Sequence, residues 1–279
     1  MRRNNMERDV AKINAQLIEN TKTWYEYIIS QYPELTDYKK YSSPFCFGLS
    51  EKEFSTTKEK TIMIVGEEAA SYWFDNHENE YDIIQEFALT YFEKQIFKEE
   101  NREKYKKYYD AFPEKKLRGN GSRFWCLFRE LAKTYNVCWN NLDKIHGVYL
   151  NKENKRETYA LNNSGQNLQF HVNANEKSLL LEEIEIVKPD VLIFLGGNYY
   201  DSISNALNIT IPNYENIRPI IIDYENIGSK ENRLAVDITP YCNNISQKVI
   251  WINHPNARKS RKNIVFNAIA NAIRDIINK

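Results

Sequence analysis

The residues best suited to chemistry follow the last apolar segment of the sequence. His254 and Pro255 come just after the apolar run at 249–252, and a basic cluster then opens the last predicted helix, at Arg258, Lys259 and Arg261. An imidazole held at a strand end can stabilise negative charge that develops during a reaction. Basic side chains at a helix N-terminus can bind phosphates. This context favours a functional histidine over an isolated surface or core histidine.

A glycine and two glutamates, Gly66, Glu67 and Glu68, end an earlier apolar segment at 61–65. A short β-branched run that stops at a glycine is typical of a buried strand that ends in a functional loop. Because glycine has no Cβ, the backbone there can approach a base or a phosphate closely. A strand-ending turn with two solvated glutamates remains the alternative interpretation.

Two adjacent asparagines, Asn140 and Asn141, follow the short apolar run at 137–139, and Lys144 comes three residues after Asn141. An asparagine amide is both donor and acceptor, so one side chain can read an edge of a base. The alternative is that the pair caps a strand or a helix. The sequence leaves open which asparagine faces the site, because a shift of one residue reverses the face of a strand.

Alternating periodicities predict the elements that position these residues. Short apolar runs predict strands at 61–65, 137–139, 191–195, 219–222, 234–238 and 249–252. Helical spacing of apolar residues predicts helices at 8–31, 81–107, 122–135, 178–187 and from about 260 to the end. The asparagine-rich stretch at 151–177 is interpreted as a long loop or a small hairpin.

The alternation of strands and helices predicts an α/β protein with a parallel or mixed sheet covered on both faces. Ligands of such sheets bind beyond the carboxyl ends of the strands. Gly66, Asn141 and His254 each follow such an end in the prediction. We therefore expect them to share one site.

The three motifs, in this order, resemble those of the uracil-DNA glycosylase superfamily. The resemblance covers about residues 58–279, including a structural element from Pro189 to Gly197, and leaves 1–57 as an N-terminal helical extension packed on the core. It implies a three-layer α/β/α fold with a central, mainly parallel sheet. It also implies hydrolysis of the N-glycosidic bond of uracil or a damaged base in DNA.

The resemblance also implies roles for individual residues. Glu68 would position the attacking water, and His254 would stabilise the departing pyrimidine anion. The base would be bound by Gly66, Glu67, Phe74 and Asn141, with Phe74 as the stacking aromatic ring. DNA would be contacted by Lys144, Asn256, Arg258, Lys259 and Arg261. Ala69 stands where the family usually has proline.

Composition limits the classes of partner. The chain has 38 basic and 38 acidic residues, so its formal net charge is zero, whereas a nucleic-acid binder usually has a basic excess. Any DNA contact must therefore come from a local basic patch. Hydrophobic residues make up 42% of the chain, enough for a sizeable core. The apolar runs are too short to span a bilayer, and the N-terminus has no signal-peptide segment.

The cysteines are scattered and form no C-x-x-C pair: Cys46, Cys126, Cys138 and Cys242. This spacing argues against a zinc ribbon and against the iron–sulfur cluster that some branches of the superfamily carry. We expect a cytoplasmic monomer with free thiols, no metal and no cofactor, whose partner is DNA and not a membrane.

Two other function classes remain open at this level. A protein with this fold that binds DNA, a nucleotide or a protein partner without excising a base would explain the altered first motif and the zero net charge. An unrelated nucleotide-handling α/β enzyme would make the His-Pro match coincidental.

Overall fold

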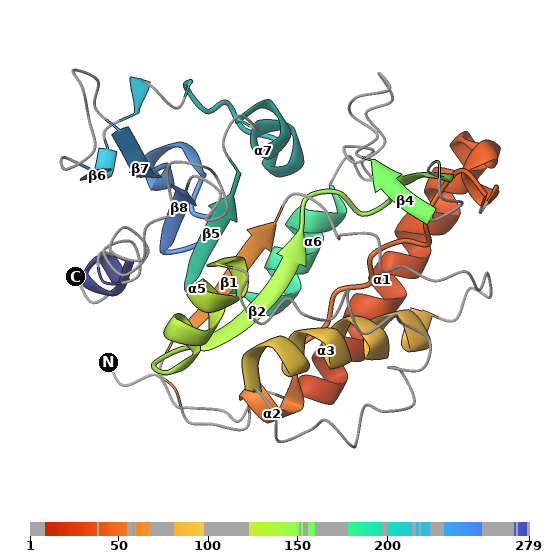
Figure 1. Cartoon of the computed structure of the whole chain (residues 1–279), viewed down its shortest axis with the longest axis horizontal. Helices are drawn as coiled ribbons and strands as arrows, with labels where there is room; N and C mark the ends of the chain where they lie inside the picture. The colour runs from red at the N-terminus through yellow and green to blue at the C-terminus, as the bar shows by residue number, and fades with distance from the viewer. Residues whose placement is uncertain are drawn as a thin grey trace.

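A six-stranded sheet forms the centre of the protein (Figure 1). The computed structural model describes residues 9–37, 39–54, 58, 60–66, 81–97, 123–150, 152, 156–159, 178–196, 200–213, 216–217, 219–223, 232–252, 271 and 273–277. The strands of this sheet are β1 (Thr61–Gly66), β2 (Asn136–Asn141), β5 (Val191–Leu195), β6 (Pro219–Asp223), β7 (Asn232–Asp237) and β8 (Lys248–Ile252).

The spatial order of the strands is β2-β1-β5-β8-β7-β6. The first four run parallel, β7 pairs antiparallel with β8, and β6 pairs antiparallel with β7. Every residue of β1, β2 and β5 is buried. Strands covered on both faces have continuous apolar runs instead of alternating ones, which is why the segments at 61–65 and 191–195 were recognisable in the sequence.

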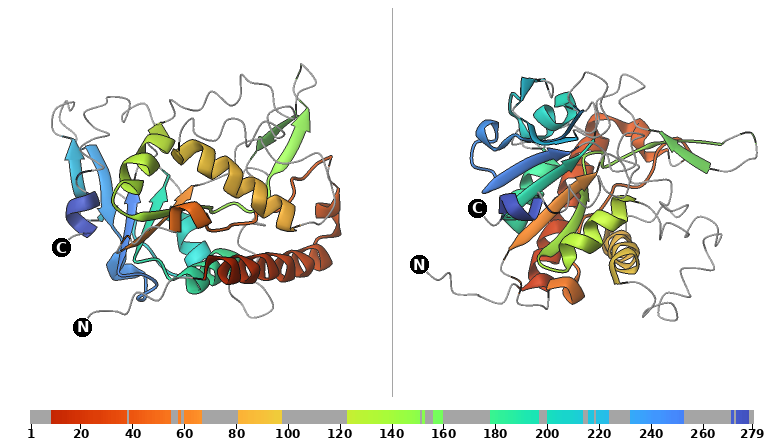
Figure 2. Two further views of the ribbon diagram at one scale, coloured as in Figure 1. Left: turned by 90° about the horizontal axis from the view of Figure 1, so that it is seen from below. Right: turned by 60° about the vertical axis from the view of Figure 1, so that its left-hand side comes forward.

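Helices cover both faces of this sheet. The left view of Figure 2 has α3 (Tyr81–Phe97) and α5 (Arg123–Ala132) on one face and α6 (Leu179–Val187) on the other. The long helix α1 (Val10–Gln31) packs against both α6 and α3. The other helices of the described residues are short, namely η1 (Pro33–Thr36), α2 (Glu51–Phe54), α7 (Tyr200–Leu207) and η6 (Thr239–Tyr241).

The six predicted strands and the mainly parallel sheet are confirmed, with strand ends that shift by at most two residues. The helix predicted at 178–187 is also confirmed, and its N-cap is the Ser178 hydroxyl, which accepts the Leu181 N–H at 3.1 Å. Part of the stretch at 151–177 is a hairpin strand, since β4 (Arg156–Tyr159) pairs antiparallel with β3 (Gly147–Leu150). Residues 151, 153–155 and 160–177 of that stretch lie outside the described residues.

The segment that follows α1 is hydrogen-bonded to the residues just beyond β2. The Ser42 N–H donates to the His146 carbonyl at 2.8 Å, and the His146 N–H donates to Ser42 Oγ at 3.0 Å. Asn14 of α1 bonds both backbone groups of Leu49, with an Oδ1 to N distance of 2.7 Å and an Nδ2 to O distance of 2.9 Å. Leu17 of α1 and Phe45 belong to the same core as the central strands. The N-terminal residues therefore help to position the end of β2.

His146 makes the stability of this arrangement depend on pH. Burial lowers the pKa of the imidazole from 6.5 to about 4. Between these values the unfolded chain binds a proton that the folded chain does not. The contribution of His146 to the free energy of unfolding is therefore fully present above about pH 6.5. It falls as the pH drops towards 4, by about 3 kcal/mol in all.

Urea unfolding measured from pH 7 down to pH 4 checks this expectation. We expect the slope attributable to this group to disappear in His146→Gln, because glutamine does not titrate. A variant that retains the full pH slope of the wild type would contradict the assignment.

Candidate functional site

Two of the predicted motifs begin side by side, where the parallel strands β1 and β2 end. Gly66 and Asn141 are the last residues of β1 and β2, and they are register partners. The Leu142 N–H donates to the Gly66 carbonyl at 2.8 Å, so the two chain segments stay together just past the strand ends. Parallel β8 ends at Ile252 on the same edge, with β5 between it and β1. Ile252, the last described residue before the His-Pro motif, therefore lies at the same end of the sheet as Gly66 and Asn141. The motif itself lies outside the described residues.

The order of the strands supports this edge as a ligand site. From β1 the chain moves to β2 at the end of the sheet, and it then crosses back over β1 to form β5. The connection that follows β1 therefore runs towards β2, whereas the connection that follows β5 runs the other way, towards β6. Ligands of open α/β sheets bind beyond the carboxyl ends of the strands at such a switch point.

Three of the predicted site residues are described, and the structure brings all three together: Gly66, Asn141 and Lys144. The others lie outside the described residues, and their roles remain predictions: Glu67, Glu68, Phe74, His254, Asn256, Arg258, Lys259 and Arg261.

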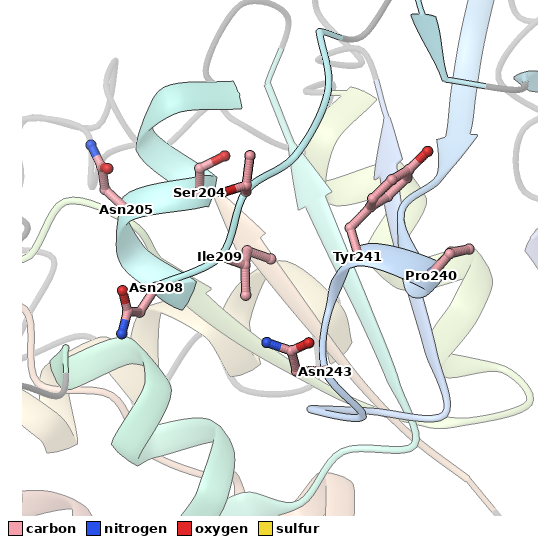
Figure 3. Close-up of a pocket in the computed structure, with 8 residues that line it drawn as sticks. Ser204, Asn205, Asn208, Ile209, Pro240, Tyr241 and Asn243 are labelled. Carbon is pink, nitrogen blue, oxygen red and sulfur yellow. The ribbon is translucent and has the colours of Figure 1, made fainter.

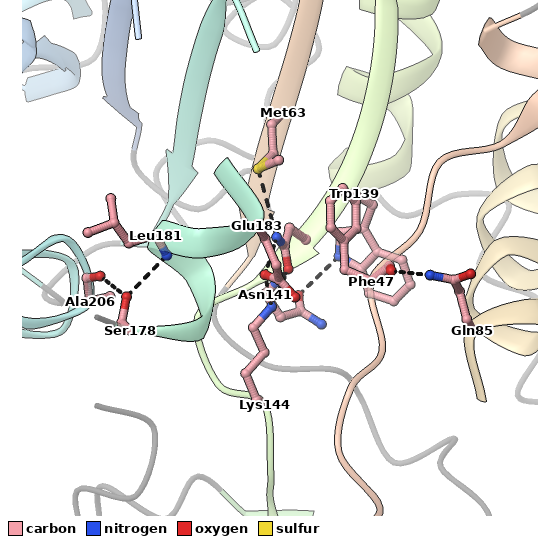
Figure 4. A network of polar contacts seen from close by, with 11 residues as sticks. Phe47, Met63, Gln85, Trp139, Asn141, Lys144, Ser178, Leu181, Glu183 and Ala206 are labelled. Carbon is pink, nitrogen blue, oxygen red and sulfur yellow. Dashed lines mark hydrogen bonds and ion pairs between the residues drawn. The ribbon is translucent and has the colours of Figure 1, made fainter. Parts of the chain in front are cut away.

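Asn141 is fully buried, and only one of the two polar groups of its side-chain amide has a hydrogen-bond partner among the described residues. Its Oδ1 accepts the indole N–H of Trp139 at 3.0 Å, and its backbone N–H donates to Asn140 Oδ1 at 2.8 Å. Among the described residues its Nδ2 has no hydrogen-bond partner (Figure 4). A buried donor without a partner costs about 1–3 kcal/mol. A ligand that offers an acceptor to this nitrogen would recover that cost.

A buried ionic network lies beside Asn141 (Figure 4). Lys144 Nζ lies 2.6 Å from Glu183 Oε2 of α6 and donates to Asn140 Oδ1 at 2.5 Å. Asn140 Nδ2 donates to the same Glu183 oxygen at 2.8 Å, and the ammonium lies 5.3 Å from the centre of the Phe45 ring. The side chains of Lys144 and Glu183 are 1% and 0% exposed.

Burial acts on both charges of this pair. It lowers the pKa of Lys144 and raises that of Glu183, and the attraction between the two groups opposes both shifts. The pair therefore depends on close contact and on the additional bond from Asn140.

The position of Lys144 corrects its assignment as a DNA contact. Its ammonium faces Glu183 and Asn140 in the interior, so in this structure it is not available to a phosphate at the surface. Its spacing from Asn141 matched the expected pattern, but the carboxylate on α6 holds it inside. Its role is to fix the chain at the end of β2.

Sequence analysis did not identify Glu183, or the parts played by Asn140 and Trp139. Glu183 lies four residues after Leu179 and four before Val187, on the buried face of α6. A carboxylate among apolar residues at helical spacing was a signal that this face holds a buried charge. The structure also resolves which asparagine is available, since Asn140 is used by the network and Asn141 keeps a free nitrogen.

The pocket shown in Figure 3 lies elsewhere in the fold. It has a volume of about 660 Å³ and neutral lining residues, namely Ser204, Asn205, Asn208, Ile209, Thr210, Pro240, Tyr241 and Asn243. These residues come from the end of α7 and from η6, which precedes the start of β8. The pocket is therefore at the amino end of β8, away from Gly66 and Asn141.

The described residues hold neither a cluster suited to a metal ion nor a helix suited to a membrane. No three side chains among His, Cys, Asp and Glu are grouped there so that they could hold a metal ion. In the same part of the chain, no helix has the length and apolar character needed to cross a membrane.

Comparison of the sequence with models of known protein families found no match. A search of curated proteins found no similar sequence.

The buried pair leads to a test of stability. Lys144→Met leaves Glu183 without its counter-ion, and loss of one partner of a buried ion pair costs about 3–5 kcal/mol. We expect the double variant with Glu183→Leu to recover much of this loss, because it removes both desolvated charges. Urea unfolding at neutral pH measures the free energies.

Lys133→Met is the matched control. Lys133 and Glu130 also form an ion pair of 2.6 Å, but their side chains are 65% and 32% exposed. Exposed pairs contribute about 0–1 kcal/mol. Equal costs for Lys144→Met and Lys133→Met would contradict the structural role of the buried pair.

Proposed function

We propose that this protein is a DNA glycosylase that removes uracil or a damaged base, with a fold like that of the uracil-DNA glycosylase superfamily. The observation that carries the proposal is the free Nδ2 of Asn141, a buried donor at the end of β2 beside Gly66. The mainly parallel sheet with helices on both faces is compatible with that fold. The common edge at which β1, β2 and β8 end also supports it.

The proposed reaction is hydrolysis of the N-glycosidic bond. Asn141 Nδ2 donates to a carbonyl oxygen of the extruded base, Gly66 lets the backbone approach it, and Glu67 and Phe74 complete the base site. The bond between the base and the sugar breaks, and its electron pair leaves with the base. His254 stabilises the resulting anion. Water positioned by Glu68 adds to the sugar carbon and loses a proton, which balances the charge.

DNA would be held outside this site by the segment that follows β8. Asn256, Arg258, Lys259 and Arg261 contact phosphates in this proposal, and the start of the last helix adds its own N–H groups. Lys144 is not part of this surface, because it is bound to Glu183 in the interior.

A second candidate function is recognition of a base without its excision. Two observations favour it: Ala69 replaces the usual proline of the first motif, and the chain has no basic excess. Such a protein would keep the Asn141 site and bind uracil-containing DNA without releasing the base.

Single-turnover release of base from uracil-containing single- and double-stranded oligonucleotides tests the proposal. We expect release by the wild type and a loss of about 10²–10³ in rate for both His254→Ala and Asn141→Ala, since each removes a group that stabilises the departing base. His171→Ala, outside every motif, is the control and should retain the wild-type rate.

The outcomes separate the candidates. Tight binding of the uracil oligonucleotide without release would favour the recognition function. Release that both variants retain would contradict the assigned site, and the absence of both release and binding would contradict both functions.

A further inference from the structure

Trp139 controls the orientation of the Asn141 amide. The two residues are two positions apart in β2, so their side chains project from the same face of the strand. The indole Nε1 donates to Asn141 Oδ1 at 3.0 Å, and both residues are buried (Figure 4).

The chemistry of the indole fixes this orientation. A tryptophan side chain has one N–H donor and no acceptor nitrogen, whereas an amide has an acceptor end and a donor end. Rotating the Asn141 amide by half a turn would place its NH₂ group against the indole N–H, donor to donor. Oδ1 therefore faces Trp139, and Nδ2 is the free end.

The indole itself is held by packing. Its ring lies 5.1 Å from Phe45, 5.2 Å from Trp125 and 5.9 Å from Tyr91, measured between ring centres. Edge-to-face and tilted contacts of this kind favour one ring orientation. On the other side, Asn140 holds the backbone N–H of Asn141. The indole is therefore held in place by packing, the backbone of Asn141 is held by Asn140, and the indole bond orients the Asn141 amide.

The fixed amide has a definite polarity towards a ligand. Its free Nδ2 is a donor, and the adjoining Oδ1 keeps one lone pair after accepting from Trp139. A base with a carbonyl oxygen beside a ring N–H matches this pair, as uracil does. A base with an amino group beside an unprotonated ring nitrogen, as in cytosine, places donor against donor and acceptor against acceptor.

We propose that Trp139 is a specificity-determining positioning residue, whose indole N–H orients Asn141 so that the site takes keto bases and rejects amino bases. This inference rests on the proposed function, because it assigns the chemical class of base that the Asn141 site accepts. Trp139 acts through Asn141 and does not itself touch the base.

Trp139→Phe tests the inference, because it removes the N–H and keeps an aromatic ring in the cluster. Trp125→Phe is the matched control, because Trp125 is about equally buried and packs on Tyr91 and on Trp139 itself. The measurement is the ratio of single-turnover release, or of affinity, for single-stranded oligonucleotides that carry one uracil or one cytosine at the same position.

We expect a wild-type preference for uracil of at least about a hundredfold, because a site built around polar groups strongly rejects a mismatched partner. Trp139→Phe should lower this ratio about tenfold or more, while Trp125→Phe keeps it. Because the ratio compares two substrates of one variant, a decrease in the fraction of folded protein affects both rates equally and cancels in the ratio. A ratio unchanged in Trp139→Phe would overturn the proposal.

The NMR signal of the Trp139 indole proton provides a readout that does not depend on DNA. It is assigned by its absence in Trp139→Phe, and we expect it to move upfield and exchange faster with solvent in Asn141→Ala. An indole signal that Asn141→Ala leaves unchanged would show that the orienting bond is absent. Wild-type protein without release or binding of either oligonucleotide would instead overturn the proposed function, while the indole signal still reports on the bond.

Discussion

The buried contact between Lys144 and Glu183 joins the two parts of the fold that meet around the carboxyl end of β2. Lys144 follows that strand, and Glu183 lies on α6, which covers the opposite face from α5. Each charge has left water, so neither is stable inside without the other. Asn140 bonds both groups and also accepts the N–H of Asn141. The geometry of the candidate site therefore depends on an ion pair that takes no part in binding.

In the resulting site, the Asn141 amide is held in one orientation and its nitrogen lacks an acceptor among the described residues. Trp139 bonds the oxygen of the Asn141 side-chain amide, and Asn140 bonds the backbone N–H of the same residue. The amide nitrogen of Asn141 has no partner among the described residues. A fold does not gain stability from an unsatisfied donor, so its presence at the carboxyl end of β2 requires an explanation. In the proposed function, recognition of a carbonyl oxygen would account for both the free nitrogen and its fixed orientation. The neutral pocket near the amino end of β8 has no buried donor without a partner among its described lining residues.

Most of the fold was predictable because the central strands are short apolar runs and the helices α1 and α6 have clear apolar faces. The convergence of Gly66 and Asn141 also followed from the rule that parallel strands end on a common edge. Helix α7 was not predicted, because it is only eight residues long and largely polar, and because two glycines precede it in the sequence. The orientation of the asparagines was not predictable, since a strand buried on both faces shows no alternation that would mark inside and outside.

Lys144 illustrates the other limit. Spacing along the chain placed it correctly next to Asn141, but spacing does not reveal that a helix some 40 residues later brings a carboxylate to it. Burial and charge pairing between distant segments are tertiary properties. The residues after β1 and β8 carry the rest of the proposed chemistry, and their roles are predictions made from the sequence.

The central claim is that Asn141 Nδ2 holds the carbonyl oxygen of a base. The most direct test is a crystal structure of the protein with an oligonucleotide that carries a non-hydrolysable deoxyuridine analogue. The account predicts that the uracil leaves the strand and lies at the carboxyl ends of β1 and β2, with a carbonyl oxygen about 2.9 Å from Asn141 Nδ2. A base bound elsewhere, or one bound there with Asn141 Nδ2 still unpartnered, would contradict it.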